Sequence, residues 1–92
     1  MVTAIILLKV QRQKIQETAT LLAGMEGFTE VFSVSGNFDL VAMARVENNE
    51  ALSDLITNKL AEVDHIEETE TMLAFKAYSK HDLEAMFGLG FE

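Results

Sequence analysis

The sequence predicts an α+β domain in which helices cover one face of a four-stranded antiparallel sheet. Two observations lead to this fold class. The chain of 92 residues is long enough for one domain and too short for two. Its apolar positions change spacing in the order strand, helix, strand, strand, helix, strand. With right-handed crossovers this order gives the ferredoxin-like arrangement, and we expect residues 1–92 to form a single domain with a tail at 79–92.

The first predicted strand, Val2 to Val10, is apolar on both of its faces. Its even-numbered positions are all apolar, and Ile5 and Leu7 make the odd-numbered face mostly apolar as well. A strand of this kind is normally covered on both sides. The helices of the same chain can cover only one face of the sheet. We therefore expect the other face to pair with a second copy, sheet against sheet, as a dimeric α+β barrel.

Two segments have the spacing of amphipathic helices. The first, Gln11 to Ala23, ends before Gly24, and its apolar stripe is Ile15, Ala19 and Leu22, with Leu21 beside it. The second begins after Asn48 or Asn49, either of which can cap it, and ends near Val63. Its apolar stripe is Leu52, Leu55, Ile56 and Leu60. Both stripes are expected to pack on the same face of the sheet.

Three further strands are predicted at Phe28 to Ser35, Asp39 to Val46 and Ile66 to Tyr78. The second and third strands are joined by a turn that contains the pair Gly36-Asn37. In the tail, Ser79-Lys80-His81-Asp82 resembles a capping box, which predicts a short helix through Leu83, Met86 and Phe87.

The charge of the chain disfavours several classes of partner. Fifteen acidic residues stand against 7 basic ones, which gives a net charge of −8 and no basic cluster for phosphates. We therefore expect no direct binding to nucleic acid and none to an anionic membrane. The absence of cysteine excludes disulfides and thiolate chemistry. The apolar start MVTAIILLKV lacks a basic leader and is too short to span a bilayer, so a cytoplasmic location is expected.

Candidate acid–base groups are few. His65 and His81 have no neighbours that form a metal pattern, since the spacing of His81, Asp82 and Glu84 is not diagnostic. We interpret both histidines as surface residues, and the acidic run Glu67 to Glu70 as a solvated strand start that discourages edge pairing. Paired carboxylates for acid–base work are the alternative interpretation of that run. The sequence predicts no catalytic residue, no metal and no cofactor.

The turn between the second and third strands carries groups suited to binding a small ligand. Backbone N–H groups around Gly36 can form an anion-binding concavity, and Asp39 offers a carboxylate nearby. Together they suit a zwitterion, although glycine and aspartate also serve turns that bind nothing. Thr69 and Thr71 share a strand face with apolar side chains, which suits a small ligand with one polar end. Good strand propensity explains these threonines equally well.

These segments resemble the effector-binding domain of Lrp/AsnC-type (feast/famine) transcriptional regulators, also called the RAM domain. The family ends a strand at a glycine and opens the next strand with an aspartate after two residues. Val31 to Leu40, VFSVSGNFDL, has this pattern with Gly36 and Asp39. The family also has a threonine-containing segment that leads into an apolar final strand, and Glu68 to Leu73 matches this segment. The resemblance covers Val2 to about Tyr78.

The resemblance implies that such domains pair through their sheets and that amino acids bind in clefts between neighbouring dimers. It implies that backbone at Gly36 and Asn37 binds the carboxylate, that Asp39 binds the ammonium, and that Thr69 and Thr71 add hydroxyls. The complete set of implied site residues is Ser35, Gly36, Asn37, Asp39, Leu40, Thr69 and Thr71. Amino-acid level would then set the oligomeric state, or pairing with a full-length regulator of the family.

One departure from the family bears on nucleic acid. Full-length members carry an N-terminal helix-turn-helix domain, whereas this sequence starts directly at the first strand. We therefore expect a stand-alone effector domain, and DNA binding is not carried over from the family.

Other functions stay open at this point. A small monooxygenase-like enzyme of the dimeric α+β barrel type would share the architecture. Such an enzyme is expected to place a histidine or tryptophan inside the barrel, and this chain has no tryptophan. A pure assembly module without ligand and an ACT-type sensor are the remaining alternatives.

Overall fold

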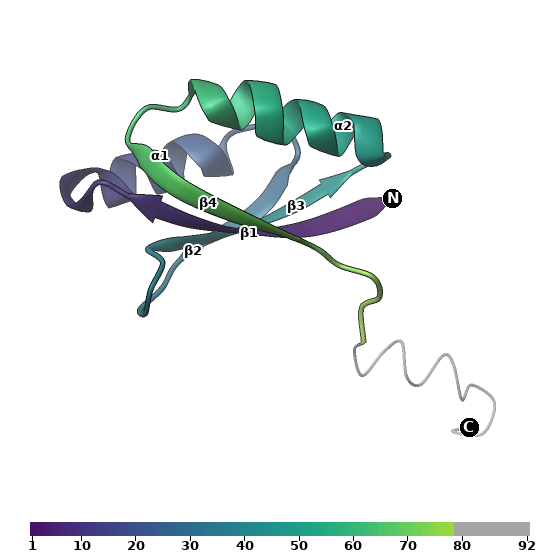
Figure 1. The fold of residues 1–92 in the computed structure, drawn as a ribbon, viewed down its shortest axis with the longest axis horizontal. Helices are drawn as coiled ribbons and strands as arrows, with labels where there is room; N and C mark the ends of the chain where they lie inside the picture. Colours follow the sequence, from purple (N-terminus) through teal and green to yellow (C-terminus); the bar gives the residue numbers. More distant parts are fainter. Residues whose placement is uncertain (79–92) are drawn as a thin grey trace.

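Residues 1–78 of the chain are described by the computed structural model, and they place two helical segments on one face of a single sheet (Figure 1). The elements are β1 (Val2–Val10), η1 (Arg12–Lys14), α1 (Ile15–Ala23), β2 (Phe28–Ser33), β3 (Leu40–Val46), α2 (Asn49–Asp54), η2 (Leu55–Lys59), η3 (Leu60–Glu62) and β4 (Ile66–Leu73). The strand order is β2-β3-β1-β4, and all neighbouring strands are antiparallel. This topology confirms the predicted ferredoxin-like fold class.

Strand β1 is a central strand, because it pairs with β3 on one side and with β4 on the other. Its even-numbered side chains face the helices, and Ala4, Ile6 and Leu8 are all 0% exposed. They pack with side chains of β3, α1 and the second helical segment, including Leu40 and Leu22, into one core cluster. The wholly apolar face predicted for this strand is therefore the inner face of the domain.

Helix α1 buries a face that differs slightly from the predicted stripe. Leu22 is fully buried, and Ile15 and Ala19 pack against the core as expected. Leu21 is 53% exposed, whereas Thr18 is only 1% exposed. Thr18 lies three residues after Ile15 and four before Leu22, so it shares their face of the helix. A search for apolar residues alone misses it because threonine is polar.

The second helical segment confirms its predicted stripe and selects between the two candidate caps. The side chain of Asn48 accepts a hydrogen bond from the backbone N–H of Ala51 at 2.8 Å, so Asn48 is the N-cap. The segment continues from α2 through the π turn η2 into the 3₁₀ turn η3. In the π turn the N–H of Leu60 bonds to the carbonyl of Leu55. This wider turn lets two leucines five positions apart both reach the core.

Two predicted strands are too long. The second strand ends at Ser33 rather than Ser35, and the fourth ends at Leu73 rather than Tyr78. The N–H of Ala74 donates to the carbonyl of Thr3, and β1 has almost no residues left to pair beyond that point. The predicted tail helix and His81 lie outside the described residues. Within residues 1–78, no helix is both long enough and apolar enough to cross a membrane.

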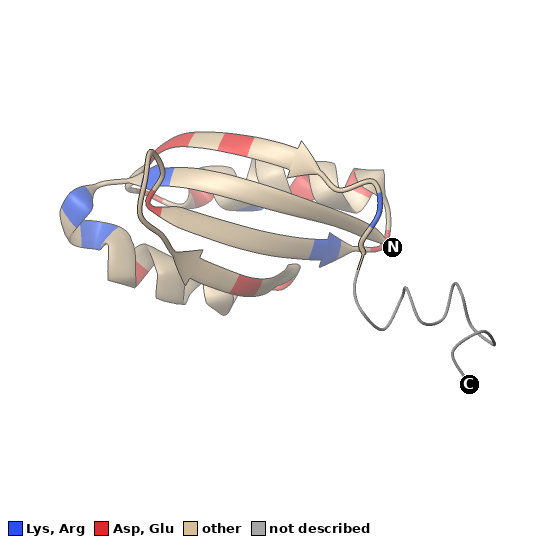
Figure 2. Cartoon of the chain, turned by 90° about the horizontal axis from the view of Figure 1, so that it is seen from below, with Lys and Arg blue, Asp and Glu red and all other residues tan. Residues whose placement is uncertain are grey.

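The face of the sheet opposite the helices is apolar in its middle. We call this surface the open face; the side chains that define it are Ile5, Leu7, Phe32, Val41, Met43 and Met72. Phe32 and Met72 are 47% and 43% exposed, and the other four are half-buried. Figure 2 views this face and shows the charged residues toward the ends and edges of the strands. The open face is therefore a contiguous apolar area with a charged margin.

Adjacent leucines on α1 provide a test of this core. Leu22→Ala should lower the free energy of unfolding by ~2–5 kcal/mol, because it leaves a cavity beneath the helix. Leu21→Ala removes the same atoms from a side chain that is 53% exposed and should change stability by less than ~1 kcal/mol. Urea denaturation followed by circular dichroism measures both. Equal losses for the two variants would contradict the orientation of α1.

Candidate functional site

The turn between β2 and β3 is fixed to the end of β1 by one residue, Asp39. The backbone N–H of Asp39 donates to the carbonyl of Leu8 at 2.8 Å, and its carbonyl accepts from the N–H of Val34 at 3.0 Å. Its side-chain Oδ2 accepts from the N–H of Val10 at 2.9 Å. The carboxylate thus carries the contact with β1 on to Val10, two residues past Leu8, the last β1 residue in the β1–β3 register. A carboxylate has several acceptor positions, so this bond does not saturate Asp39.

The tip of the same turn is exposed and needs glycine for its conformation. Gly36 has a φ of +116°, a region that side chains with a Cβ rarely adopt. A Cβ added there would meet no heavy atom within 4 Å, so backbone geometry and not crowding requires the glycine. Ser35 and Asn37 beside it are exposed. The turn projects from the side of the sheet that lies opposite the helices (Figure 1).

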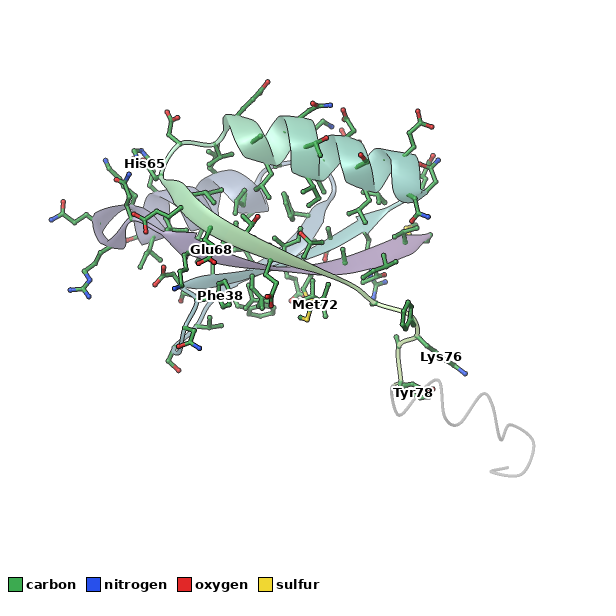
Figure 3. The ribbon with its side chains drawn as sticks, viewed as in Figure 1. Phe38, His65, Glu68, Met72, Lys76 and Tyr78 are labelled. Atoms are coloured by element: carbon green, nitrogen blue, oxygen red, sulfur yellow. The ribbon has the colours of Figure 1, made fainter. Side chains whose placement is uncertain are left out.

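Three further side chains gather beside the turn, at the end of β1. Lys9 Nζ lies 6.0 Å from the centre of the Phe38 ring and 3.6 Å from Glu68 Oε2. Figure 3 shows Phe38 and Glu68 at the same end of the sheet. We call Lys9, Phe38, Asp39 and Glu68 the turn corner. It combines a cation, an aromatic face and two carboxylates next to the exposed backbone of the turn.

Sequence reasoning did not predict Lys9, Phe38 or Glu68 as site residues. The available signal was Lys9, which is the only charged residue of the first predicted strand. Its partners come from the turn and from β4, so their proximity follows from strand order and register.

The predicted threonines lie on the other side of the sheet from the turn corner. Thr69 pairs with Leu8 and Thr71 pairs with Ile6, and cross-strand partners project to the same face. Since Leu8 and Ile6 face the helices, so do the two threonines, at the exposed edge formed by β4. Within one chain the structure therefore does not bring Thr69 and Thr71 together with the turn.

The remaining predicted residues are placed as follows. Leu40 is 0% exposed, so its side chain belongs to the core and only its backbone is available to a ligand. His65 lies at the corner before β4, has a φ of 77°, and its Nε2 lies 3.7 Å from Glu17 Oε2. Among residues 1–78, no three His, Cys, Asp or Glu side chains are grouped as a metal site.

Comparison with known proteins identifies the family of the chain. A sequence model described as the Lrp/AsnC ligand binding domain matches residues 3–83. The HTH-type transcriptional regulator FL11 of Pyrococcus horikoshii is 31% identical over 77 residues, which are 84% of this chain and 50% of the regulator. The FL11 protein of Pyrococcus furiosus is 29% identical, and the match covers 86% of this chain and 52% of the regulator. The chain thus spans about half the length of these curated relatives.

Among solved structures, TTHA0845 from Thermus thermophilus superposes with a TM-score of 0.80 at 36% identity, covering 87% of this chain and 100% of that one. E. coli AsnC shares the fold, with a TM-score of 0.75 at 22% identity, and the match covers 85% of this chain and 53% of AsnC. The fold and the sequence model together define the class of protein as a ligand-binding domain. The chain belongs to the Lrp/AsnC ligand-binding domain family.

Replacement of Asp39 tests how the turn is held. Asp39→Ala should speed hydrogen exchange of the Val10 amide and destabilise the fold by ~1–3 kcal/mol, because a half-buried N–H loses its acceptor. Asp39→Asn keeps an acceptor oxygen and should retain most of the protection of the Val10 amide from hydrogen exchange. Exchange rates from NMR report this amide directly. An unchanged Val10 rate in the alanine variant would contradict the anchoring role.

Proposed function

We propose that the chain is a non-catalytic module that binds an amino acid and assembles with copies of itself to regulate transcription. The observation that carries the proposal is the turn corner, where exposed backbone N–H groups and charges of both signs meet beside an apolar open face. Membership of a ligand-binding domain family supports it. So do the curated relatives, which are named transcriptional regulators.

In this proposal the amino acid binds at the turn. Backbone N–H groups at Gly36 and Asn37 hold its carboxylate, with Ser35 beside them, and Asp39 holds its ammonium through acceptor positions that Val10 leaves free. Lys9 and Glu68 add charges of both signs at the same corner.

Thr69 and Thr71 would reach such a ligand only from another subunit, because they lie on the opposite face of their own sheet. The proposed site is therefore completed where subunits meet. A ligand at a boundary between subunits favours the assembly for which its affinity is higher. Amino-acid level then sets the oligomeric state, or the pairing of this chain with a full-length regulator of the family. No step of this mechanism requires catalysis.

The open face supports the self-assembly part of the proposal. The six apolar side chains of the open face would be removed from water if two sheets packed together. The charged residues at its margin would remain at the rim, as in other protein interfaces. Among the described residues, Glu70 pairs with Leu7 and so projects to the margin of this face from the edge strand β4, whereas His65 lies at the corner next to α1.

A charge in the middle of the open face tests the dimer. Met43→Glu should convert the dimer to monomer at micromolar concentration, because it buries an unpaired carboxylate between the sheets. Leu21→Glu introduces the same charge on the helix side and should leave the dimer intact. Light scattering distinguishes 10.2 kDa from twice that mass. A monomeric wild-type protein would contradict the sheet-to-sheet dimer.

A thermal-shift screen of the twenty amino acids at millimolar concentration tests binding. A ligand at a hundred times its dissociation constant adds ~2.7 kcal/mol of stability. Asp39→Asn retains an acceptor for Val10 but lacks the charge, so it should weaken binding by roughly 10- to 100-fold. If no amino acid raises the melting temperature, the chain is an assembly module without this ligand. Unchanged affinity in Asp39→Asn would remove Asp39 from the site.

A further inference from the structure

After β4 the chain leaves the sheet as a short projecting segment. The backbone N–H of Ala74 donates to the carbonyl of Thr3 at 2.9 Å and so holds the start of this segment to β1. The next residues belong to neither helix nor strand, and they project to the side of the sheet that lies opposite the helices (Figure 1). Figure 3 shows Lys76 and Tyr78 away from the sheet on this side. We call residues 74–78 the arm.

The arm exposes two aromatic side chains to water. Phe75 is 97% exposed, and Tyr78 is 70% exposed. Lys76 Nζ lies 5.3 Å from the centre of the Tyr78 ring, so these two side chains share one side of the arm. Alternate residues of an extended chain point the same way, which directs Phe75 to the other side. Its ring gains almost no burial from its own domain, and transfer of the ring to an apolar surface would be favourable.

A groove lies at the outer edge of the sheet, beside β2. It is bounded by β2 and by η1 with α1, and its volume is about 590 Å³. Its apolar lining is Ile15, Ala19 and Val31. Within residues 1–78, β2 pairs with β3 alone, so the backbone of its outer edge is open to a further strand. This groove, which we call the β2 groove, can therefore accept an aromatic ring together with the backbone that carries it.

The opposite edge of the sheet is less suited to the arm. The groove beside β4 has a volume of about 250 Å³, and Glu67 and Glu68 line it. Charged side chains on an edge strand disfavour the addition of another strand. Among the described residues, no carboxylate lines the β2 groove, and Arg12 contributes a guanidinium that can stack on an aromatic ring. The lining of the two grooves thus favours the β2 edge.

The direction of the arm relates it to a second copy rather than to its own β2 groove. Strands β1 and β3 separate β4 from β2, and the β2 groove lies on the helix side, whereas the arm points to the other side. In the proposed dimer a second sheet lies against the open face, on the side to which the arm projects. Packed sheets lie ~10 Å apart, and five extended residues span up to ~16–18 Å. The arm is therefore long enough to pass the edge of the second sheet and reach the groove behind it.

We propose that the arm of each subunit binds along β2 of the second copy and inserts Phe75 into the β2 groove there. The exchange is reciprocal in a two-fold dimer, because each copy supplies one arm and one groove. It covers the open edge of β2 and adds apolar contact outside the open face. This inference rests on the sheet-to-sheet dimer of the proposed function and identifies a second contact that holds it together.

Replacement of Phe75 tests the contribution of the arm to the dimer. Phe75→Ser should raise the dissociation constant of the dimer about tenfold or more, because it removes the ring that enters the groove. Leu21→Ser is the matched control. Leu21 is 53% exposed and belongs neither to the β2 groove nor to the open face, so this variant should dimerise like wild type. Analytical ultracentrifugation over a dilution series measures both constants. Equal constants for Phe75→Ser and wild type would overturn the arm contact.

Introduced cysteines test where the arm binds, since the natural chain has none. A chain with Gln16→Cys in the β2 groove and Ala77→Cys in the arm changes two exposed positions. Under mild oxidation it should form a covalent dimer whose digest contains a peptide joining positions 16 and 77. Leu21→Cys with Ala77→Cys should give no corresponding link. A 16–77 link within a monomer would mean that the arm folds back on its own domain. That result, or the absence of any 16–77 link, would overturn the proposal.

The outcomes separate this inference from the proposed function. A monomeric wild-type protein would contradict the sheet-to-sheet dimer and the arm contact together. A wild-type dimer that Phe75→Ser leaves unchanged, with no 16–77 link, would contradict the arm contact alone. If Phe75→Ser leaves the dimer unchanged and abolishes a larger assembly, the arm joins neighbouring dimers, and the exchange within one dimer is wrong.

Discussion

The fold depends on the burial of β1 between its two neighbours and beneath the helices. Its even-numbered side chains supply the middle of the core, and its backbone pairs with β3 and β4 over most of its length. Because Ile5 and Leu7 make the other face apolar as well, this strand also gives the open face its character. One strand thus couples the stability of a single chain to its tendency to associate.

Asp39 links that strand to the turn. Its carboxylate accepts a hydrogen bond from the N–H of Val10 and so fixes the turn next to the end of β1. The exposed backbone of Gly36 and Asn37 is presented by a rigid base rather than by a free loop. Pre-organisation of this kind reduces the ordering cost of binding a small ligand. Asp39 is proposed both to anchor the turn and to contact the ligand. A variant such as Asp39→Asn is therefore informative, because it removes the charge and keeps a hydrogen-bond acceptor.

The two faces of the sheet divide the surface into separate regions. The open face and the turn corner lie on one side, where a second sheet and an amino acid are proposed to bind. The two helical segments cover the other side. An amino acid bound at the turn corner can therefore stabilise the end of the central strand β1.

The order of the elements, the helical stripes and the turn at Gly36 were predictable from the sequence, because periodicity and turn chemistry are local properties. Tertiary structure decided the rest. Strand β4 stops at Leu73 because its partner strand ends, and Thr18 is buried because of the helix face that it shares with its apolar neighbours. Lys9 meets Glu68 and Phe38 only through strand order and register, and register also turns the threonines of β4 toward the helices. Register is set by pairing between distant segments, and one residue of shift would exchange the two faces of a strand.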